Sequence, residues 1–312
     1  MSLGSKPSEN RRLVIVEAVI TFGDQAPPET HGLGADSIVC CRLRNLWSVR
    51  CGVRDGLASP TSRQNQVMVE LRLKGKVALV TGASRGIGAS VARMLASRGA
   101  DIAINYHSKG SRAEDVATEV RAIGRRALLV QADLTNPDDV TAMIELIRVE
   151  YGRLDVLILN ASGGLEKDKP ADYAMQLNST AQVRLVEMAL PLMPRGGRII
   201  FVTSHMAHFY REKPVYGPYE PVAASKYAGE RALRTRGAEF EMRGIAFVVV
   251  SGDMIEGTIT PKLLERMNKG VIESRRRQAG SLPTVEEFAR AIADAAFNAE
   301  KNSATIFVGS TE

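Results

Sequence analysis

An alternation of apolar runs and amphipathic stretches begins at Leu73 and continues almost to the C-terminus of the chain. Short runs rich in Val, Ile and Leu are each followed by a longer stretch with apolar residues at helical spacing. After the run at 76–82, for example, Ile87, Val91 and Leu95 share one helical face. This order is typical of a parallel sheet covered by helices on both faces. The pattern therefore predicts an α/β domain with a doubly wound parallel sheet.

The alternation predicts seven strands in one sheet. The strands are expected at 76–82, 101–106, 126–133, 154–161, 197–204, 244–252 and 304–309. Helices are expected at 87–100, 113–124, 137–152, 172–193, 224–243 and 284–298. The composition, 45% hydrophobic and 24% charged, is that of a globular protein with a full core.

The chain before Gln66 lacks sustained periodicity. It contains all three cysteines, but no CxxC pair and no second ligand at metal spacing from His31, so no zinc site is predicted. We interpret residues 1–70 as a poorly ordered extension, or as upstream sequence translated from a start codon set too early. The domain is then 71–312 and has no cysteine, which suits a reducing cytoplasm. The three cysteines are Cys40, Cys41 and Cys51.

The formal net charge of +6 raises the question of a nucleic-acid partner. Acidic residues are interspersed with the basic ones, and the densest basic run, "ESRRRQ" at 273–278, has no interleaved aromatic residue. Such a run is usually a solvated helix face. No apolar run approaches the roughly 18 residues of a membrane helix. We therefore expect a soluble, cytoplasmic protein with neither nucleic acid nor membrane as partner.

The stretch "TGASRGIG" lies between the first predicted strand and the first predicted helix. A dinucleotide pyrophosphate requires a tight turn, close approach of the backbone and free amides at a helix N-terminus. Gly82, Gly86 and Gly88 supply the first two requirements, and the helix supplies the third. The stretch predicts a nucleotide-binding site in a Rossmann-type fold.

Several motifs together carry a family resemblance. The glycine-rich stretch, "ADL" at 132–134, "LNAS" at 159–162 and "VTS" before a downstream lysine resemble the classical short-chain dehydrogenase/reductase family. The resemblance extends from Leu73 to about Gly309. It implies a seven-stranded Rossmann domain that binds NAD(H) or NADP(H). It also implies homodimers or homotetramers, in which the helices predicted at 172–193 and 224–243 pair across subunits.

The resemblance assigns cofactor contacts residue by residue. Asp133 and Leu134 would contact the adenine, and Asn160 and Ala161 would contact the nicotinamide ribose. The residues that would surround the phosphates are Gly82, Ser84, Arg85, Gly86, Ile87 and Gly88. Ser162 departs from the family's usual Asn-Ala-Gly triplet. The residues themselves favour NADPH over NADH, because the ribose position has Asn105 instead of a carboxylate, and Arg85 and Lys109 can pair with a 2′-phosphate.

The catalytic positions follow the family only in part. Asn178, Ser204 and Lys226 match its active-site asparagine, its substrate-orienting serine and its ribose-binding lysine. The family's tyrosine, whose pKa the lysine would lower, is expected four positions before that lysine, where this chain has Val222. A positioned general acid contributes about 10² to 10⁴ in rate, so its loss would cripple a carbonyl reductase. The question is which group replaces it.

Tyr219 is the predicted substitute, because a residue seven positions before Lys226 lies on the same helical face. Two features oppose it: helical side chains lean toward the N-terminus, and Pro221 favours a helix that begins after Tyr219. The alternative donors are Tyr216, Glu220, His205 and His208. Gly252 and Thr258 are two further expected cofactor contacts. The sequence around them differs from the family pattern, because Ser251 replaces the family's proline and Thr258 is displaced by two positions.

Three functions are compatible with these residues. The first is an NADP(H)-dependent oxidoreductase that transfers a hydride between the nicotinamide and a carbonyl or alcohol substrate, with a non-standard proton donor. The second is a nucleotide-binding sensor, subunit or scaffold without redox turnover, which Val222 supports. The third, a basic nucleic-acid binder, rests on charge alone. We expect the first, with a substrate pocket formed by 163–173 and 259–282, which carry no readable specificity code.

Overall fold

The computed structural model describes residues 41–43, 46–48, 72–166, 168–298 and 304–312. The chain divides into two units, Met1–Pro60 and Thr61–Glu312. In the first unit, β1 (Cys41–Leu43) and β2 (Leu46–Ser48) pair in antiparallel fashion. The other residues of 1–70 lie outside the described part of the chain. The predictions of a poorly ordered extension and of a domain boundary at 70 fall on them.

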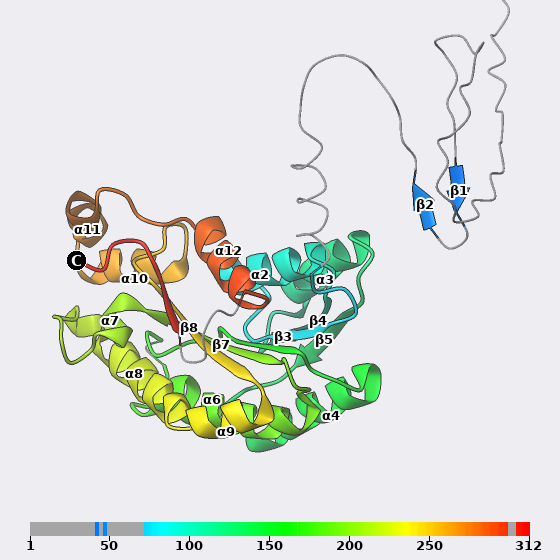
Figure 1. Cartoon of the computed structure of the whole chain (residues 1–312). Helices are drawn as coiled ribbons and strands as arrows, with labels where there is room; N and C mark the ends of the chain where they lie inside the picture. The colour runs from blue at the N-terminus through cyan, green and yellow to red at the C-terminus, as the bar shows by residue number, and fades with distance from the viewer. Residues whose placement is uncertain (1–40, 44–45, 49–71, 167, 299–303) are drawn as a thin grey trace, which may run out of the picture. The chain divides into compact units, whose positions relative to one another are not determined.

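The second unit is built on a seven-stranded parallel sheet, as predicted (Figure 1). Its strands are β3 (Val77–Val80), β4 (Asp101–Tyr106), β5 (Ala127–Gln131), β6 (Val156–Leu159), β7 (Arg198–Ser204), β8 (Ala246–Gly252) and β9 (Ala304–Val308). The spatial order is β5-β4-β3-β6-β7-β8-β9, so the chain reverses direction across the sheet between β3 and β6. In such sheets ligands bind outside the carboxyl ends of the strands at this reversal.

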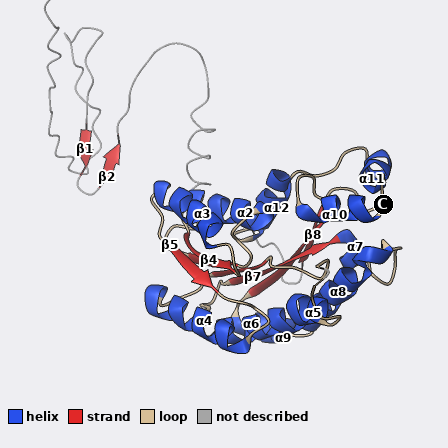
Figure 2. Ribbon diagram, turned by 180° about the vertical axis from the view of Figure 1, so that it is seen from behind, coloured by secondary structure: helices blue, strands red, loops and turns tan. Residues whose placement is uncertain are grey.

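Two apolar cores separate the sheet from its helices, one on each face (Figure 2). The central strands β3 and β6 are buried on both sides, which is why they appear in the sequence as continuous apolar runs. One face is covered by α2 (Gly86–Ser97), α3 (Gly110–Ala122) and α12 (Val285–Ala295). The other is covered by α4 (Pro137–Tyr151), α6 (Ala181–Ala189), α8 (Glu220–Arg234) and α9 (Gly237–Arg243).

Two of the predicted long helices are divided in the structure. The segment at 172–193 consists of α5 (Tyr173–Met175), a π-helical turn η1 (Gln176–Thr180), α6 and a 3-10 turn η2 (Leu190–Leu192). The segment predicted at 224–243 is α8 followed by α9. The break follows Thr235, whose hydroxyl donates to the carbonyl of Ala232 and so competes with the helical pattern.

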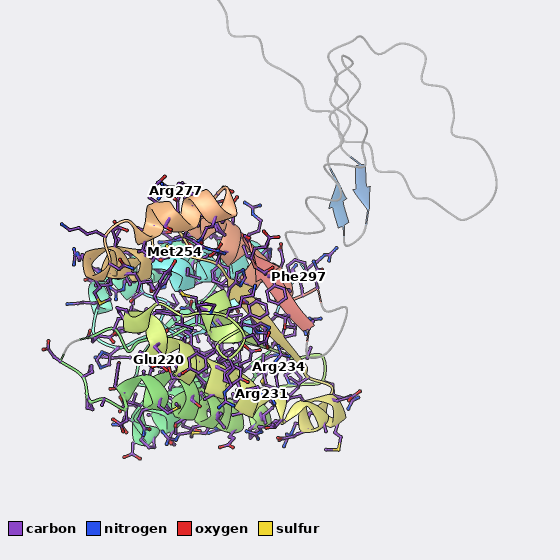
Figure 3. The ribbon with its side chains drawn as sticks, turned by 90° about the vertical axis from the view of Figure 1, so that its left-hand side faces the viewer. Glu220, Arg231, Arg234, Met254, Arg277 and Phe297 are labelled. Carbon is purple, nitrogen blue, oxygen red and sulfur yellow. The ribbon has the colours of Figure 1, made fainter. Side chains whose placement is uncertain are left out.

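Helix α8 begins at Glu220, four residues before the prediction, because Pro221 fits the first turn of a helix. In Figure 3, Glu220 lies near its start and Arg231 and Arg234 near its end. Three further helices are α7 (His205–His208), α10 (Ile259–Met267) and α11 (Val271–Ala279), and only the basic run within α11 was interpreted as a helix face from the sequence. α7 is too short to give a periodic signal, and α11 contains the basic run at 273–278, whose mean hydropathy is too low for a periodic apolar face.

Candidate active site

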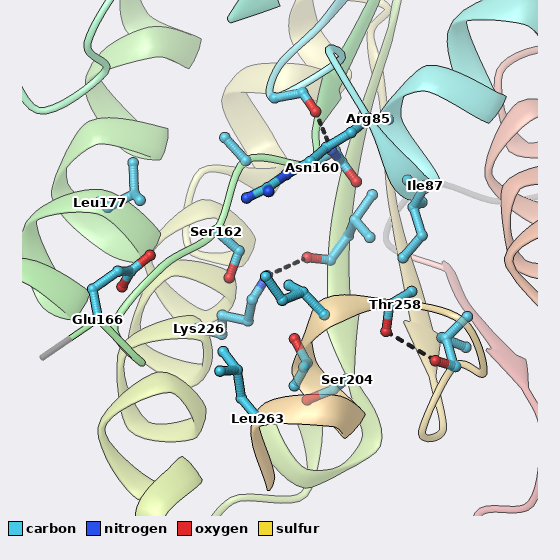
Figure 4. Close-up of a pocket in the computed structure, with 18 of the residues that line it drawn as sticks. Arg85, Ile87, Asn160, Ser162, Glu166, Leu177, Ser204, Lys226, Thr258 and Leu263 are labelled. Carbon is cyan, nitrogen blue, oxygen red and sulfur yellow. Dashed lines mark hydrogen bonds between the residues drawn. The ribbon is translucent and has the colours of Figure 1, made fainter. Parts of the chain in front are cut away.

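A cavity of about 760 Å³ lies at the carboxyl ends of the strands and extends from β5 to α10. Figure 4 shows Arg85 and Asn160 at one end, Ser204 and Leu263 at the other, and Lys226 between them. Fifteen of the seventeen predicted site residues line this one cavity. They are Gly82, Ser84, Arg85, Gly86, Ile87, Gly88, Asn105, Asp133, Leu134, Asn160, Ala161, Ser204, Tyr219, Lys226 and Thr258. The other two are Asn178 and Gly252.

The glycine-rich turn has the geometry that its sequence requires. Gly82 and Gly86 have φ of 62° and 55°, in the left-handed region that favours glycine. At Gly88, a Cβ atom would lie 2.5 Å from the carbonyl oxygen of Gly82 and 2.7 Å from Asn160 Nδ2. That amide in turn donates to the carbonyl of Thr81 over 2.8 Å. The backbone around the turn is therefore held close, with no room for a side chain at position 88.

The N-terminus of α2 faces the cavity and has no side-chain cap. Its first backbone N–H groups have no partner within the helix, and the helix dipole adds positive potential there. Arg85, which also lines the cavity, makes no ion pair within the part of the chain that is described. The open turn, the uncapped amides and the unpaired guanidinium together fit the phosphates of a dinucleotide.

Replacing Gly88 by alanine should abolish dinucleotide binding. The added Cβ meets backbone and a buried amide, so the turn must move; we expect at least about a 10²-fold loss of NADPH affinity, equivalent to about 2.7 kcal/mol. Fluorescence titration of NADPH measures this. Gly110→Ala is the matched control, because its Cβ would sit at an ordinary 3.6 Å from the Tyr106 ring. Equal affinity of Gly88→Ala and wild type would contradict the assignment of the phosphate site.

Asn105 lies near the end of β4, as expected, but its side-chain amide hydrogen-bonds to the backbone of neighbouring segments. It is buried, its Oδ1 accepts from the backbone N–H of Gly82 over 3.2 Å, and its Nδ2 points to the carbonyls of Val130 and Ala132. Asn105 therefore orients the glycine-rich turn as well as lining the cavity. Just beyond it, His107 and Lys109 also line the cavity, and no ion pair to Lys109 occurs in the described ranges.

Asp133 lies at the same end of the cavity. Burial raises the pKa of its carboxyl, but hydrogen bonds from the hydroxyl and backbone N–H of Thr135 outweigh this and hold the pKa below its usual value. His107 Nε2 lies 3.5 Å from Asp133 Oδ2. The helix cap of α4 is Asn136 and not Asp133.

Ser204 and Tyr219 meet at the other end. Tyr219 ends a 3-10 turn, η3 (Gly217–Tyr219), directly before α8, and its hydroxyl lies 3.1 Å from Ser204 Oγ. Ser204 Oγ also accepts from the backbone N–H of Ala207 over 3.2 Å. Tyr219 is 5% exposed; burial raises the pKa of its phenol, and the bond to Ser204 opposes that rise only in part. The phenol is thus protonated at neutral pH.

Lys226 is buried beneath the same cavity. Its Nζ donates to the carbonyl of Val202 over 3.0 Å, and burial lowers its pKa from 10.5 to about 8. The ammonium form therefore predominates at neutral pH. No hydrogen bond joins Lys226 to Tyr219 in the described structure, and the pKa of Tyr219 is raised, whereas the family resemblance implied a lowered one. The cause is that burial of the phenol dominates.

Asn178 and Gly252 were predicted as site residues and do not line the cavity. Asn178, in the π-helical turn η1, bonds both backbone groups of Gly163 and the hydroxyl of Ser225. It therefore ties the loop after β6 to α8 next to Lys226. At Gly252, a Cβ would lie 2.7 Å from the ring of Phe288, a residue that does line the cavity. Its smallness serves helix packing, which a motif comparison alone could not reveal.

The alternative proton donors point elsewhere. His205 bonds Ser251, His208 bonds the buried Glu230, and neither these histidines nor Tyr216 nor Glu220 lines the cavity. Val222 is buried in an apolar cluster that also contains Tyr219. Of all the donors considered from the sequence, only Tyr219 faces the cavity and contacts Ser204.

The sequence predicted two segments that form the substrate end of the cavity, but not the individual residues that line it. Both expected segments contribute: Glu166 and Tyr173 from one, and much of α10 from the other. Further apolar lining residues had no signal in the sequence, because their neighbours come from distant parts of the chain. They are Leu177, Met206 and Met254, and Figure 3 shows Met254 between α8 and the segment of α10 and α11. No described helix is long and apolar enough to cross a membrane, and no described group of His, Cys, Asp or Glu is arranged to hold a metal.

Comparisons with known proteins give a consistent result. A family model described as short chain dehydrogenase matches residues 76–268. A hydroxynaphthalene reductase of Aspergillus fumigatus is 38% identical over 182 residues, which are 56% of this chain and 64% of that protein. A versicolorin reductase of Emericella nidulans is 39% identical over 142 residues, 44% of this chain and 54% of that protein. The chain thus spans between about half and two thirds of these curated relatives.

Solved structures match over more of their length. A short chain dehydrogenase from Burkholderia cenocepacia in complex with NADP is 29% identical, with a TM-score of 0.67, and the match covers 76% of this chain and 97% of that one. An angucycline C-6 ketoreductase with bound NADP is 30% identical, with a TM-score of 0.64, over 77% of this chain and 96% of that one.

Proposed function

The chain belongs to the short-chain dehydrogenase family, and from that premise we propose that it is an NADPH-dependent reductase of a carbonyl group. The observation that carries the proposal is the hydrogen bond between Ser204 and Tyr219, 3.1 Å long, in the same cavity as the glycine-rich turn and Lys226. The two hydroxyls could both hydrogen-bond to the oxygen of a substrate carbonyl. The chain would thus have a proton donor although Val222 occupies the position of the family's tyrosine.

The bound dinucleotide supplies the hydride, and the chain's own residues do the rest. The glycine-rich turn and the N-terminus of α2 hold the phosphates, and Lys226 holds the nicotinamide ribose. The Ser204 hydroxyl accepts from Ala207 and so is free to donate its own hydrogen to the substrate oxygen. Tyr219 delivers the proton to that oxygen. The phenol is protonated at neutral pH and so carries the proton that the reduction consumes.

NADPH is the proposed cofactor because of charge at the adenosine end. Arg85 and Lys109 line the cavity without ion pairs within the described residues, and Asn105 brings no carboxylate. A 2′-phosphate would find two cations there, and the residue at the ribose position carries no charge. NADP bound to the Burkholderia neighbour and to the angucycline ketoreductase supports the same choice.

Removing these cations should change cofactor preference. We expect Arg85→Ala and Lys109→Ala each to weaken NADPH binding by about 10-fold to 100-fold, because a charged hydrogen bond contributes about 1.5 to 3 kcal/mol. NADH affinity should change less than NADPH affinity in both variants. Paired fluorescence titrations measure the ratio, with Arg112→Ala as a control, since Arg112 is exposed on α3 outside the cavity. An unchanged ratio would contradict NADPH selection by these residues.

The substrate is proposed to be a bulky ketone with an apolar body. Leu177, Met206, Met254 and Leu263 give the substrate end apolar walls, and Tyr173 adds an aromatic one. The relatives named for hydroxynaphthalene, versicolorin and angucycline substrates support aromatic polycyclic ketones as the first panel. Consumption of NADPH with such ketones, compared with small aliphatic ketones, tests the proposal. Faster turnover of small ketones would contradict the proposed substrate class.

A further inference from the structure

His205 follows Ser204 directly, but its side chain lies outside the active-site cavity. The ring is 7% exposed, and its Nδ1 lies 2.8 Å from the hydroxyl of Ser251, which is fully buried near the end of β8. Strands β7 and β8 are neighbours in the sheet, with Ser204 paired to Gly252. The His205–Ser251 hydrogen bond therefore joins the chain just past β7 to the last residues of β8, behind the proposed reaction site.

The imidazole lies among aromatic rings, and the charges of Asp253 and Arg275 also act on it. The rings of Phe209 and Phe307 contact it edge-on, with centroids at 6.4 Å and 5.7 Å. Its Nε2 is buried without a hydrogen-bond partner in the described structure. Burial lowers the pKa of His205 to about 4, so the ring is neutral at physiological pH. The Ser251 hydroxyl gives the ring its short hydrogen bond, and a backbone group of Gly309 also acts on it.

His205 is also the first residue of α7, a helix of only four residues. So short a helix is not stable without tertiary contacts. The N-cap of α7 is Ser204, whose Oγ accepts from Ala207 and shares a hydrogen bond with Tyr219. Any shift of α7 moves the Ala207 N–H and so turns the Ser204 hydroxyl away from the Tyr219 phenol. The contacts that hold α7, the His205–Ser251 bond and the His208–Glu230 bond, therefore bear on the geometry of the proposed catalytic pair.

We propose that His205 and Ser251 form a positioning pair that fixes the Ser204 hydroxyl against Tyr219. The inference rests on the proposed function for its kinetic consequence, but the positional link itself does not depend on turnover. It also gives a physical reason for a serine at position 251: a residue without a hydroxyl there leaves Nδ1 of a buried imidazole without a partner, at a cost comparable to a lost buried hydrogen bond.

The test uses Ser251→Ala, His205→Phe, the double variant and His205→Asn, in the full-length protein. Asparagine places an amide near the position of Nδ1 and should restore the bond in part. Tyr227→Phe is the control, because the Tyr227 hydroxyl makes no hydrogen bond in the described structure. The first readout needs no activity: the ¹³C chemical shift of the Tyr219 phenolic carbon at neutral pH, assigned with Tyr219→Phe. Thermal unfolding and NADPH titration accompany it.

We expect the Tyr219 signal to shift in both single variants, to shift no further in the double variant, and to return toward wild type in His205→Asn. With an accepted ketone, kcat should fall about 10-fold in each single variant and no further in the double one, with NADPH affinity within about twofold. An unmoved Tyr219 signal, or losses in kcat that multiply in the double variant, would overturn the proposal. A shifted signal in a protein that reduces no ketone would support the pair and count against the reductase instead.

Discussion

Tyr219→Phe should lower kcat for ketone reduction by about 10² to 10⁴-fold while leaving NADPH affinity unchanged, because a positioned general acid contributes that much to the rate. The phenol contacts Ser204 Oγ at 3.1 Å and is protonated at neutral pH, and no other donor considered lines the cavity. Single-turnover oxidation of bound NADPH measures the effect without interference from product release. The packing cost should be small, since the ring is kept.

Tyr216→Phe is the control, because Tyr216 lies three residues away and does not line the cavity. If both variants lost activity equally, the effect would be one of loop packing, and Tyr219 would not be the donor. Restoring a tyrosine at Val222 is a less direct experiment. Val222 is 3% exposed within the cluster that contains Tyr219, so the larger side chain would overpack the core at about 1 to 3 kcal/mol.

Lys226→Met should have opposite effects on activity and stability. Loss of the ammonium removes the proposed ribose contact, and we expect kcat/KM to fall by at least about 10²-fold, as for a charged hydrogen bond at the upper end of its range. The same change removes a buried charge whose pKa is lowered from 10.5 to about 8. After subtraction of the lost bond to Val202, the free energy of unfolding at neutral pH should rise by about 1 to 3 kcal/mol.

The sign of the pH dependence follows from that lowered pKa. The unfolded chain binds the lysine proton more tightly than the native protein, so burial destabilises the native state fully below about pH 8. The penalty disappears as the pH rises through 10.5, and the stability advantage of Lys226→Met should disappear with it. In the wild type, kcat/KM should fall above about pH 8 as Lys226 loses its charge. Denaturant unfolding at several pH values measures the first effect; a variant less stable than wild type at neutral pH would contradict it.

The fold could be predicted from the sequence because both determinants of a doubly wound sheet are local. Strands buried on two faces appear as continuous apolar runs, and helices appear as periodic ones, so all seven strands of the sheet were found. Elements whose stability comes from distant contacts were missed. Helix α7 depends on the contacts of His205 and His208, and α10 and α11 pack through Leu264 and Val271 into the apolar cluster that contains Tyr219.

The candidate site divides in the same way. The glycine-rich turn could be predicted residue by residue, because position 88 excludes any side chain and the motif is contiguous. Asn178 and Gly252, which do not line the cavity, are residues whose chemistry fits a site and whose side chain or face is used in packing. Tyr219 needed the structure: the direction of its hydroxyl depends on the 3-10 turn before α8, and spacing along an ideal helix gave conflicting expectations.

Transfer of deuterium from labelled NADPH to a ketone is the most direct test of the proposed reaction. Full-length protein would be mixed with NADPH deuterated at the nicotinamide C4 position and with the panel of aromatic polycyclic ketones, and the products analysed by mass spectrometry and NMR. We predict deuterium on the carbinol carbon of at least one alcohol product, with wild-type protein and Tyr216→Phe but not with Tyr219→Phe. Tight binding of NADPH without deuterium in any product would contradict the reductase and leave a nucleotide-binding protein without redox turnover.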